Sequence, residues 1–152
     1  MPYTLEEVAN YSDIPELTDE IVSLGDGFAQ AHEALTSLAQ GFESVTPGAS
    51  AVRCWPHHFD IATLIGLAEG DPETAPSIGV GFSPGDTSYA EPYLYCSPWP
   101  GPDHLPPAPS PWRWHTAGFT SLICTIETLD QSEMSSILNS AVSTVRKLLD
   151  NA

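Results

Sequence analysis

The sequence predicts an α+β domain in which an antiparallel sheet of three to four strands carries an N-terminal and a C-terminal helix on one face. Two amphipathic helical patterns flank a central region that is rich in β-branched and aromatic residues. Proline and glycine divide this central region into short runs, as is typical of strands joined by turns. The 152 residues fit a single domain, residues 1–152, with residues 1–16 as a flexible N-terminal segment.

The first helix is predicted from an apolar stripe between residues 17 and 42, with Thr18 as its candidate N-cap. Apolar residues recur there at alternating steps of four and three, which places them on one stripe of a helix: Leu17, Ile21, Leu24, Phe28, Ala31, Leu35, Leu38 and Phe42. We expect the stripe to pack on the sheet, although its 3.5-residue repeat also suits a helix–helix dimer seam.

The second helix is predicted over residues 134–149, where apolar residues again fall on one stripe: Met134, Ile137, Leu138, Ala141, Val142, Val145, Leu148 and Leu149. Residues 130–133 form a capping-box pattern with Asp130 as the cap. Arg146 and Lys147 near the C-terminal end complement the helix dipole.

Four strands are predicted between the helices, at residues 52–65, 77–82, 91–97 and 114–126. Pro84 and Gly85 have the residue types of the central positions of a type II turn, so the second and third strands should form an antiparallel hairpin. The proline-rich residues 98–111 can form neither a helix nor a central strand, and we expect a long extended loop. Gly79 and Gly81 should let another backbone or an aromatic ring approach their strand closely.

The composition limits the kinds of partner that this chain can have. Four basic residues stand against twenty acidic ones, for a formal net charge of -16, which disfavours nucleic acid and anionic membranes as partners. Cys54, Cys96 and Cys124 lie in apolar runs and are expected to be buried thiols without a disulfide. The first twenty residues have no basic residue and no apolar run of signal-peptide length, so we expect a cytoplasmic protein.

Side-chain alternation along the strands predicts one polar and aromatic face, turned away from the helices. In this register His57 faces the apolar side, whereas seven polar or aromatic residues converge on the other face: His58, Asp60, Glu91, Tyr93, Tyr95, Arg113 and His115. Trp99, in the proline-rich loop, is expected to cover one end of this face and to create a partly desolvated concavity for a ligand.

Three hypotheses for this face stay open at the level of sequence. His58, Asp60 and His115, with Glu91 as a further donor, have the ligand types of a zinc, iron or manganese site, which implies a divalent metal as cofactor. The same histidines and Asp60 could instead act as acid–base catalysts, with Arg113 stabilising an anion and Tyr93 or Tyr95 donating a hydrogen bond. In the third hypothesis these polar groups pair with the backbone and with one another or form a dimer interface, and any ligand is bound without catalysis.

Four short runs resemble a pattern found in a family of uncharacterised bacterial proteins of unknown function. They are WPHHFDIAT at residues 55–63, GFSPGD at 81–86, EPY at 91–93 and SPWP at 97–100. The resemblance covers about residues 52–120 and implies that these runs belong to one structural unit. It implies no activity, since the family has none assigned.

The function that the sequence favours is the binding of a small molecule on the polar and aromatic face, with catalysis as an open extension. The alternative is a non-catalytic structural or interaction protein whose polar face is an oligomer interface. The apolar helix stripes and the aromatic sheet face together predict a homodimer. No motif in the chain specifies a reaction.

Overall fold

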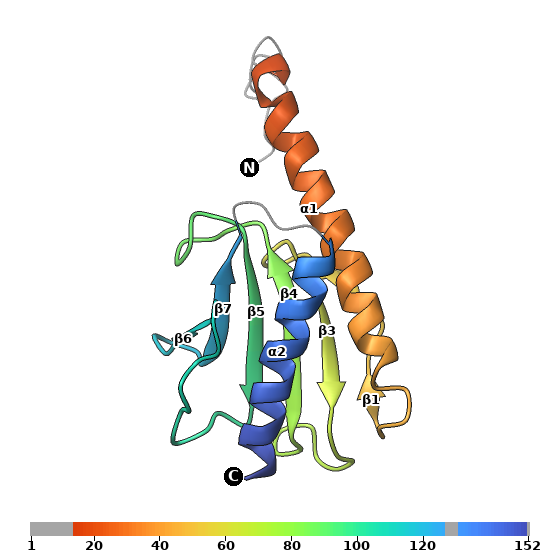
Figure 1. Ribbon diagram of the computed structural model, residues 1–152. Helices are drawn as coiled ribbons and strands as arrows, with labels where there is room; N and C mark the ends of the chain where they lie inside the picture. The colour runs from red at the N-terminus through yellow and green to blue at the C-terminus, as the bar shows by residue number, and fades with distance from the viewer. Residues whose placement is uncertain (1–13, 127–130, 152) are drawn as a thin grey trace, which may run out of the picture.

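The computed structural model describes residues 14–126 and 131–151, which form an open seven-stranded antiparallel sheet with two helices on one of its faces (Figure 1). The elements follow one another along the chain as α1 (Ile14–Gln40), β1 (Gly48–Ala49), β2 (Arg53–Trp55), β3 (Asp60–Gly66), β4 (Ser77–Ser83), β5 (Tyr93–Trp99), β6 (Arg113–His115), β7 (Ser121–Thr125) and α2 (Gln131–Asp150). The α+β class is confirmed, whereas the expected three to four strands are too few.

The strand count differs because two of the predicted strands are hairpins and because the short strand β1 was not predicted. Residues 52–65 form β2, a turn at residues 56–59, and β3, which pair antiparallel with Trp55 opposite Asp60. Pro56 has no N–H to donate to a strand ladder, and Phe59 has a φ of 54°, which ends any extended conformation there. Residues 114–126 similarly divide into β6 and β7 around Gly118, whose φ is 89°.

The strands lie in the order β1-β3-β4-β5-β7-β6, and β2 also pairs with β3. The predicted hairpin is confirmed, since β4 and β5 pair antiparallel with Ser83 opposite Tyr93. At its turn, Gly85 has a φ of 115°, and a Cβ there would come within 2.7 Å of the carbonyl oxygen of Ala90. The turn therefore requires glycine at this position for both conformation and space.

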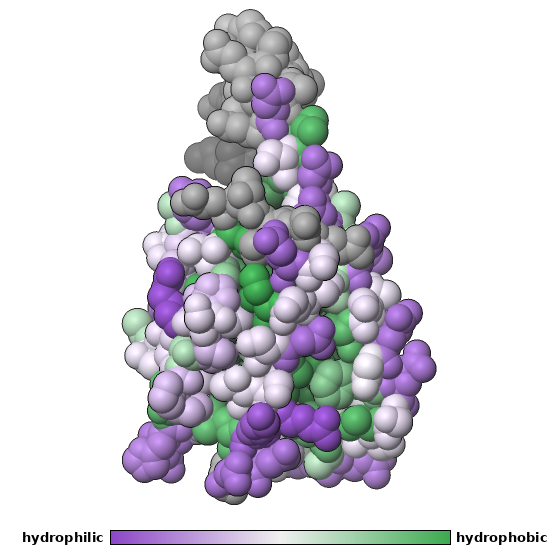
Figure 2. Space-filling model, viewed as in Figure 1, coloured by the Kyte–Doolittle hydropathy of each residue, from purple (hydrophilic) through white to green (hydrophobic). Residues whose placement is uncertain are grey.

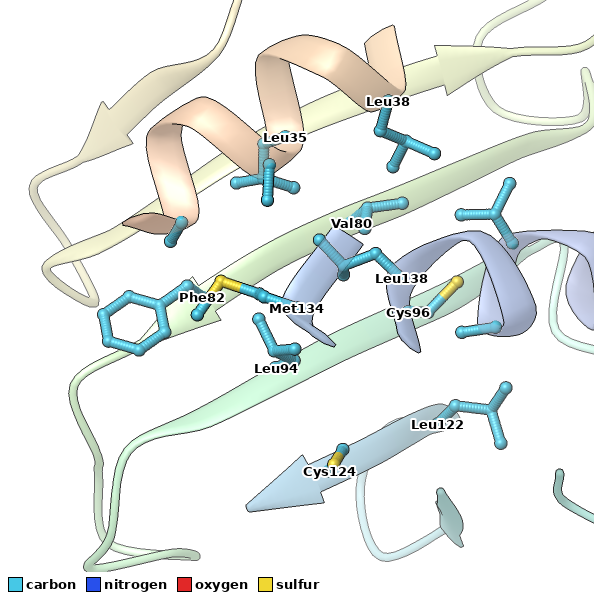
Figure 3. Close-up of a cluster of buried hydrophobic side chains, with 14 of the residues drawn as sticks. Leu35, Leu38, Val80, Phe82, Leu94, Cys96, Leu122, Cys124, Met134 and Leu138 are labelled. Carbon is cyan, nitrogen blue, oxygen red and sulfur yellow. The ribbon is translucent and has the colours of Figure 1, made fainter. Parts of the chain in front are cut away.

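The hydrophobic core lies between the sheet and the two helices (Figure 3). Leu35 and Leu38 of α1 and Met134 and Leu138 of α2 are directed at the strands, where they meet two cross-strand rows of fully or almost fully buried side chains: Val80, Cys96 and Leu122, and Phe82, Leu94 and Cys124. The predicted stripe of α2 and the second half of the α1 stripe are thus confirmed as packing surfaces.

The first half of α1 extends beyond the edge of the sheet (Figure 1). Ile21 and Val22 are 59% and 56% exposed, and hydrophobic residues appear among hydrophilic ones on this part of the surface (Figure 2). The expectation that the whole stripe packs on the sheet is therefore wrong for Ile21, because no strand lies beneath it. Neither helix in the described ranges has the length and apolar character that a membrane crossing requires.

Other local expectations have mixed outcomes. Residues 100–112 form an irregular connection as expected, but Pro98 and Trp99 belong to β5. All three cysteines are free, yet Cys54 is exposed, so its expected burial is wrong. Most of the predicted flexible segment, residues 1–13, and the predicted cap Asp130 lie outside the described residues.

Truncation of Leu138 should test the helix–sheet core. Leu138 is fully buried, so Leu138→Ala should lower the free energy of unfolding by about 2–5 kcal/mol. Leu64→Ala is the matched control, because Leu64 is 52% exposed and its truncation should cost about 0.5 kcal/mol or less. Urea denaturation of both variants measures the difference, and equal losses would contradict the assigned core.

Candidate functional site

The sheet face turned away from both helices, here called the open face, carries the predicted polar and aromatic residues. The strand register places Asp60, Ala62 and Leu64 of β3 on this face together with residues from four other strands: Gly79 and Gly81 of β4, Tyr93, Tyr95 and Ser97 of β5, Arg113 and His115 of β6, and Ser121 and Ile123 of β7. This face points away from the viewer in Figure 1. The predicted alternation is correct for Asp60, Tyr93, Tyr95, Arg113 and His115.

Tyr95 crosses the neighbouring strand to reach Asp60. Gly81 stands opposite Tyr95 in the register, and a Cβ at Gly81 would overlap the Tyr95 ring. The ring therefore lies across the glycine, and its hydroxyl donates a hydrogen bond to Oδ2 of Asp60 on the next strand. The expected close approach of an aromatic ring is confirmed at Gly81, whereas a Cβ at Gly79 would meet only the Cβ of Ser97, at 4.0 Å.

Asp60 is a buried carboxyl group with one unsatisfied oxygen. The residue is 7% exposed, and its Oδ1 atom has no hydrogen-bond partner within residues 14–126 and 131–151. An unpaired buried acceptor costs about 1–3 kcal/mol, so such atoms in native proteins usually have a reason. Among the described residues, Oδ1 is the buried side-chain oxygen that has no hydrogen-bond partner to explain its burial.

A cleft of about 470 Å³ lies beside Asp60 on the open face. Its walls come from β2, the 56–59 turn, β3, β4 and β5, and we call it the Asp60 cleft after this lining: Trp55, His57, His58, Asp60, Ala62, Thr63, Leu64, Gly79 and Tyr95. His57 was expected on the apolar side of a strand, which is wrong. Both histidines lie in the turn between β2 and β3, are exposed, and line the cleft from its rim.

A second carboxylate–tyrosine pair lies near the first. The Tyr93 hydroxyl donates a hydrogen bond of 2.7 Å to Oδ2 of Asp86, whose Oδ1 accepts from the backbone N–H groups of Ser88 and Tyr89. Partial burial acts to raise the pKa of Asp86, but these hydrogen bonds and the charge of His58 outweigh it and leave the pKa below its usual value. The sequence analysis missed Asp86, although an Asp that follows a Pro-Gly turn often accepts such backbone hydrogen bonds.

Both tyrosines are held in the protonated form. Burial, followed by the hydrogen bond to Asp86, raises the pKa of Tyr93 to about 12. Burial and then the hydrogen bond to Asp60 raise the pKa of Tyr95 still further above that of a free phenol. At neutral pH both hydroxyls are therefore hydrogen-bond donors and not bases.

His115 lies on the far side of the open face from β3, and ring contacts through Tyr89 and Tyr93 connect it to Tyr95. Its Nε2 is 2.9 Å from the carbonyl oxygen of Ala117, so Nε2 carries a proton, and in the neutral ring Nδ1 accepts from the Tyr89 hydroxyl at 2.8 Å. Phe119 stacks on the imidazole, and the Arg113 guanidinium lies 5.0 Å from the centre of the Tyr89 ring.

The structure does not assemble His58, Asp60 and His115 into one site. β6 is four positions from β3 in the sheet, which corresponds to about 19 Å at 4.8 Å per strand. Within the described ranges, no group of three or more His, Cys, Asp and Glu side chains is placed to hold a metal ion. The proposed three-residue metal and catalytic sets are therefore wrong, because the sequence does not reveal which strands are neighbours.

Two further predicted site residues lie outside the Asp60 cleft. Glu91 is exposed and precedes β5, so it does not join Asp60 as expected. Trp99 lies at the opposite end of β5 from Tyr93, and its indole N–H donates to the carbonyl oxygen of Glu73 at 3.0 Å. Trp99 therefore does not cover the cleft, whereas Trp55, which the sequence analysis overlooked as a site residue, lines it.

A scan against models of protein families finds no match, and comparisons with curated proteins and with solved structures find none either. The resemblance to the bacterial family described above therefore stays a prediction. The function has to be inferred from the geometry of the open face.

Alanine substitution of the two β4 glycines tests whether the Tyr95 ring lies across Gly81. Comparing the two variants separates the clash with this ring from the general effect of replacing a strand glycine by alanine. Gly81→Ala places a methyl group in the Tyr95 ring and should destabilise the protein by about 1–3 kcal/mol. Gly79→Ala has room for its methyl group and should be neutral or stabilising by up to about 1 kcal/mol, since alanine restricts the unfolded chain. Urea denaturation measures both, and a stable Gly81→Ala would exclude the crossing.

Alkaline titration should reveal the two hydrogen-bonded phenols. In the folded protein Tyr93 should ionise near pH 12 and Tyr95 later, whereas both ionise near pH 10.0 after unfolding. Because the folded-state pKa values are raised, this contribution to stability is complete below about pH 10 and is lost as the pH rises through the folded-state values. Ultraviolet absorbance of the phenolates measures the curve, and Asp60→Asn should shift one late step to lower pH. Ionisation of all tyrosines near pH 10 in the folded state would contradict both pairs.

Proposed function

We propose that this protein binds a small organic molecule in the Asp60 cleft. The observation that supports this most directly is the Oδ1 atom of Asp60, which is buried beside the cleft without a partner in the described part of the chain. A ligand that donates a hydrogen bond to Oδ1 would remove the cost of this unsatisfied acceptor.

The dimensions and lining of the cleft also suit a small molecule. Its volume of about 470 Å³ falls within the range of ligand pockets, about 300–1,000 Å³. Trp55, Leu64 and Gly79 offer apolar contact area, while Asp60, His58 and Tyr95 supply a few polar groups that can fix the orientation of a ligand. This combination of apolar walls and few polar groups is typical of binding sites.

If the bound molecule reacts, the side chains that line the cleft can offer it acid–base catalysis. The imidazole of His58 and the carboxylate of Asp60 can move protons, whereas the Tyr95 hydroxyl, with its raised pKa, donates a hydrogen bond. His115 takes no part in this proposal because it lies on β6.

Exposed hydrophobic side chains favour a second candidate function, an interface with another copy of the chain. Four large side chains on the open face are strongly exposed: Trp55 at 49%, Leu64 at 52%, Trp99 at 47% and Phe119 at 44%. A dimer formed through this face would bury them, in accordance with the homodimer that the sequence predicts.

A ligand-observed NMR screen of a fragment library tests the proposed function. Several fragments should bind the wild type, and Gly79→Val should abolish their binding because the new side chain fills the floor of the cleft. Thr125→Val is the matched control: it introduces the same side chain at an exposed position of β7 on the same face, outside the cleft lining, and should retain binding.

The same proteins distinguish the two candidates. Sedimentation velocity should show whether the wild type dimerises, and Trp99→Lys should dissociate a dimer formed through the open face. A dimer of this kind without any fragment that binds would favour the interface and contradict the proposed binding function. Fragments that bind Gly79→Val as well as the wild type would also contradict it.

A further inference from the structure

We infer that the ligand of the Asp60 cleft is an organic cation whose positively charged nitrogen pairs with Oδ1 of Asp60 and packs against Trp55. This inference rests on the proposed binding function and specifies the chemical class of the ligand, an ammonium or guanidinium compound with an apolar part. It depends on the charge, the aromatic lining and the donor set of the cleft.

The negative charge of Asp60 favours a cationic ligand. A buried carboxylate is costly unless it is paired and hydrogen-bonded. Tyr95 satisfies only Oδ2, and no ion pair to Asp60 is found in the described ranges. Arg53 stands opposite Ala62 on the same face, but it is exposed and does not form that pair. A cationic ligand would supply the positive charge needed to pair with the Asp60 carboxylate.

The aromatic lining of the cleft also favours a cation. Trp55 is directly opposite Asp60 in the register and is half exposed, and the Tyr95 hydroxyl marks the other side of the carboxylate. The faces of tryptophan and tyrosine attract cations, and recognition of ammonium groups commonly uses such residues beside a carboxylate. The overall charge of -16 also raises the local concentration of cations around the protein.

The donor atoms in the cleft do not suit a bare metal ion as the occupant. A metal ion requires several donor atoms in one place, and the described residues contain no group of three or more His, Cys, Asp and Glu side chains that could provide them. An organic cation needs only one carboxylate, since its apolar part is held by the walls of the cleft. This difference in donor requirement favours the organic class.

Access to Oδ1 involves the turn at residues 56–59. Oδ1 is shielded from solvent, so a cation reaches it only when the atoms that cover it shift. The rim includes His57 and His58, and all four residues of the turn are exposed. Phe59 in this turn has a left-handed φ of 54°, which is rare for a bulky residue and common near functional sites. Binding should therefore perturb this turn.

Three probes of matched size test the class: 2-phenylethylamine, which is cationic, 2-phenylethanol, which is neutral, and 3-phenylpropionate, which is anionic. Titrations followed by backbone amide shifts should give at least tenfold tighter binding for the amine than for the alcohol, with no measurable binding of the carboxylate. The shifts should include residues 55–60. Asp60→Asn should reduce the preference for the amine over the alcohol to about threefold or less.

Asp86→Asn is the matched control for this substitution. It removes the same charge from a neighbouring Asp that does not line the cleft, and it should leave the preference for the amine unchanged. Should Asp60→Asn fail to fold, intermolecular NOEs on the wild type provide a second measurement. The methylene beside the amine nitrogen should give NOEs to the rings of Trp55 and Tyr95, and their absence would overturn the inference.

The outcomes separate this inference from the proposed function. If the alcohol or the carboxylate binds within threefold of the amine, or if Asp60→Asn keeps the preference, the cationic class is wrong while binding in the cleft stands. If 2-phenylethylamine does not bind and the fragment screen shows no excess of cationic fragments among those that bind, the cationic class of ligand is also wrong. If no probe and no library fragment binds the wild type, the proposed function itself is wrong.

Discussion

The hydrogen bond from Tyr95 to Asp60 is the interaction on which the candidate site depends. It joins β5 to β3 across β4, and it exists because residue 81 has no side chain. The two carboxylate oxygens thereby acquire different surroundings: Oδ2 accepts from the phenol, while Oδ1, beside the cleft, has no partner among the residues that the structure describes. One glycine thus allows Tyr95 to cross β4, to reach Asp60 and to line the cleft.

The surrounding elements hold this arrangement at one end of the sheet. Trp55 and Asp60 close the β2–β3 hairpin, and Tyr93 with Asp86 fixes the loop between β4 and β5 nearby. Phe59, at the end of the 56–59 turn, packs edge to face on Phe28 of α1, which also contacts Phe82 of β4. The turn that forms the rim of the cleft is thereby linked to the helix on the opposite side of the sheet, so packing in the core and geometry at the site are not independent.

Individual residues show how far sequence patterns led to this site. Alternation correctly assigned Asp60, Tyr93 and Tyr95 to one face, because the period of a strand is fixed by backbone geometry. It failed for His57, which lines the cleft although it was assigned to the apolar face, because a proline and a left-handed Phe59 convert the supposed strand into a turn. His58 lies in the same turn and lines the cleft with Asp60, on the side where alternation placed it. Alternation also failed for Glu91, which lies before its strand begins, and it missed Asp86 and Trp55, whose partners Tyr93 and Asp60 each lie across a turn.

The sequence by itself determined the local features: two helices with apolar stripes, a hairpin at Pro84-Gly85, an irregular proline-rich connection, and a polar and aromatic face on the sheet. These features follow from periodicity and from the backbone restrictions of proline and glycine, which act within a few residues. Only the tertiary structure decided which strands are neighbours beyond the predicted β4–β5 hairpin, and this separated His115 from Asp60 and brought Trp55 and Tyr95 to the same carboxylate. The order of strands depends on packing between distant segments, and side-chain alternation contains no information about it.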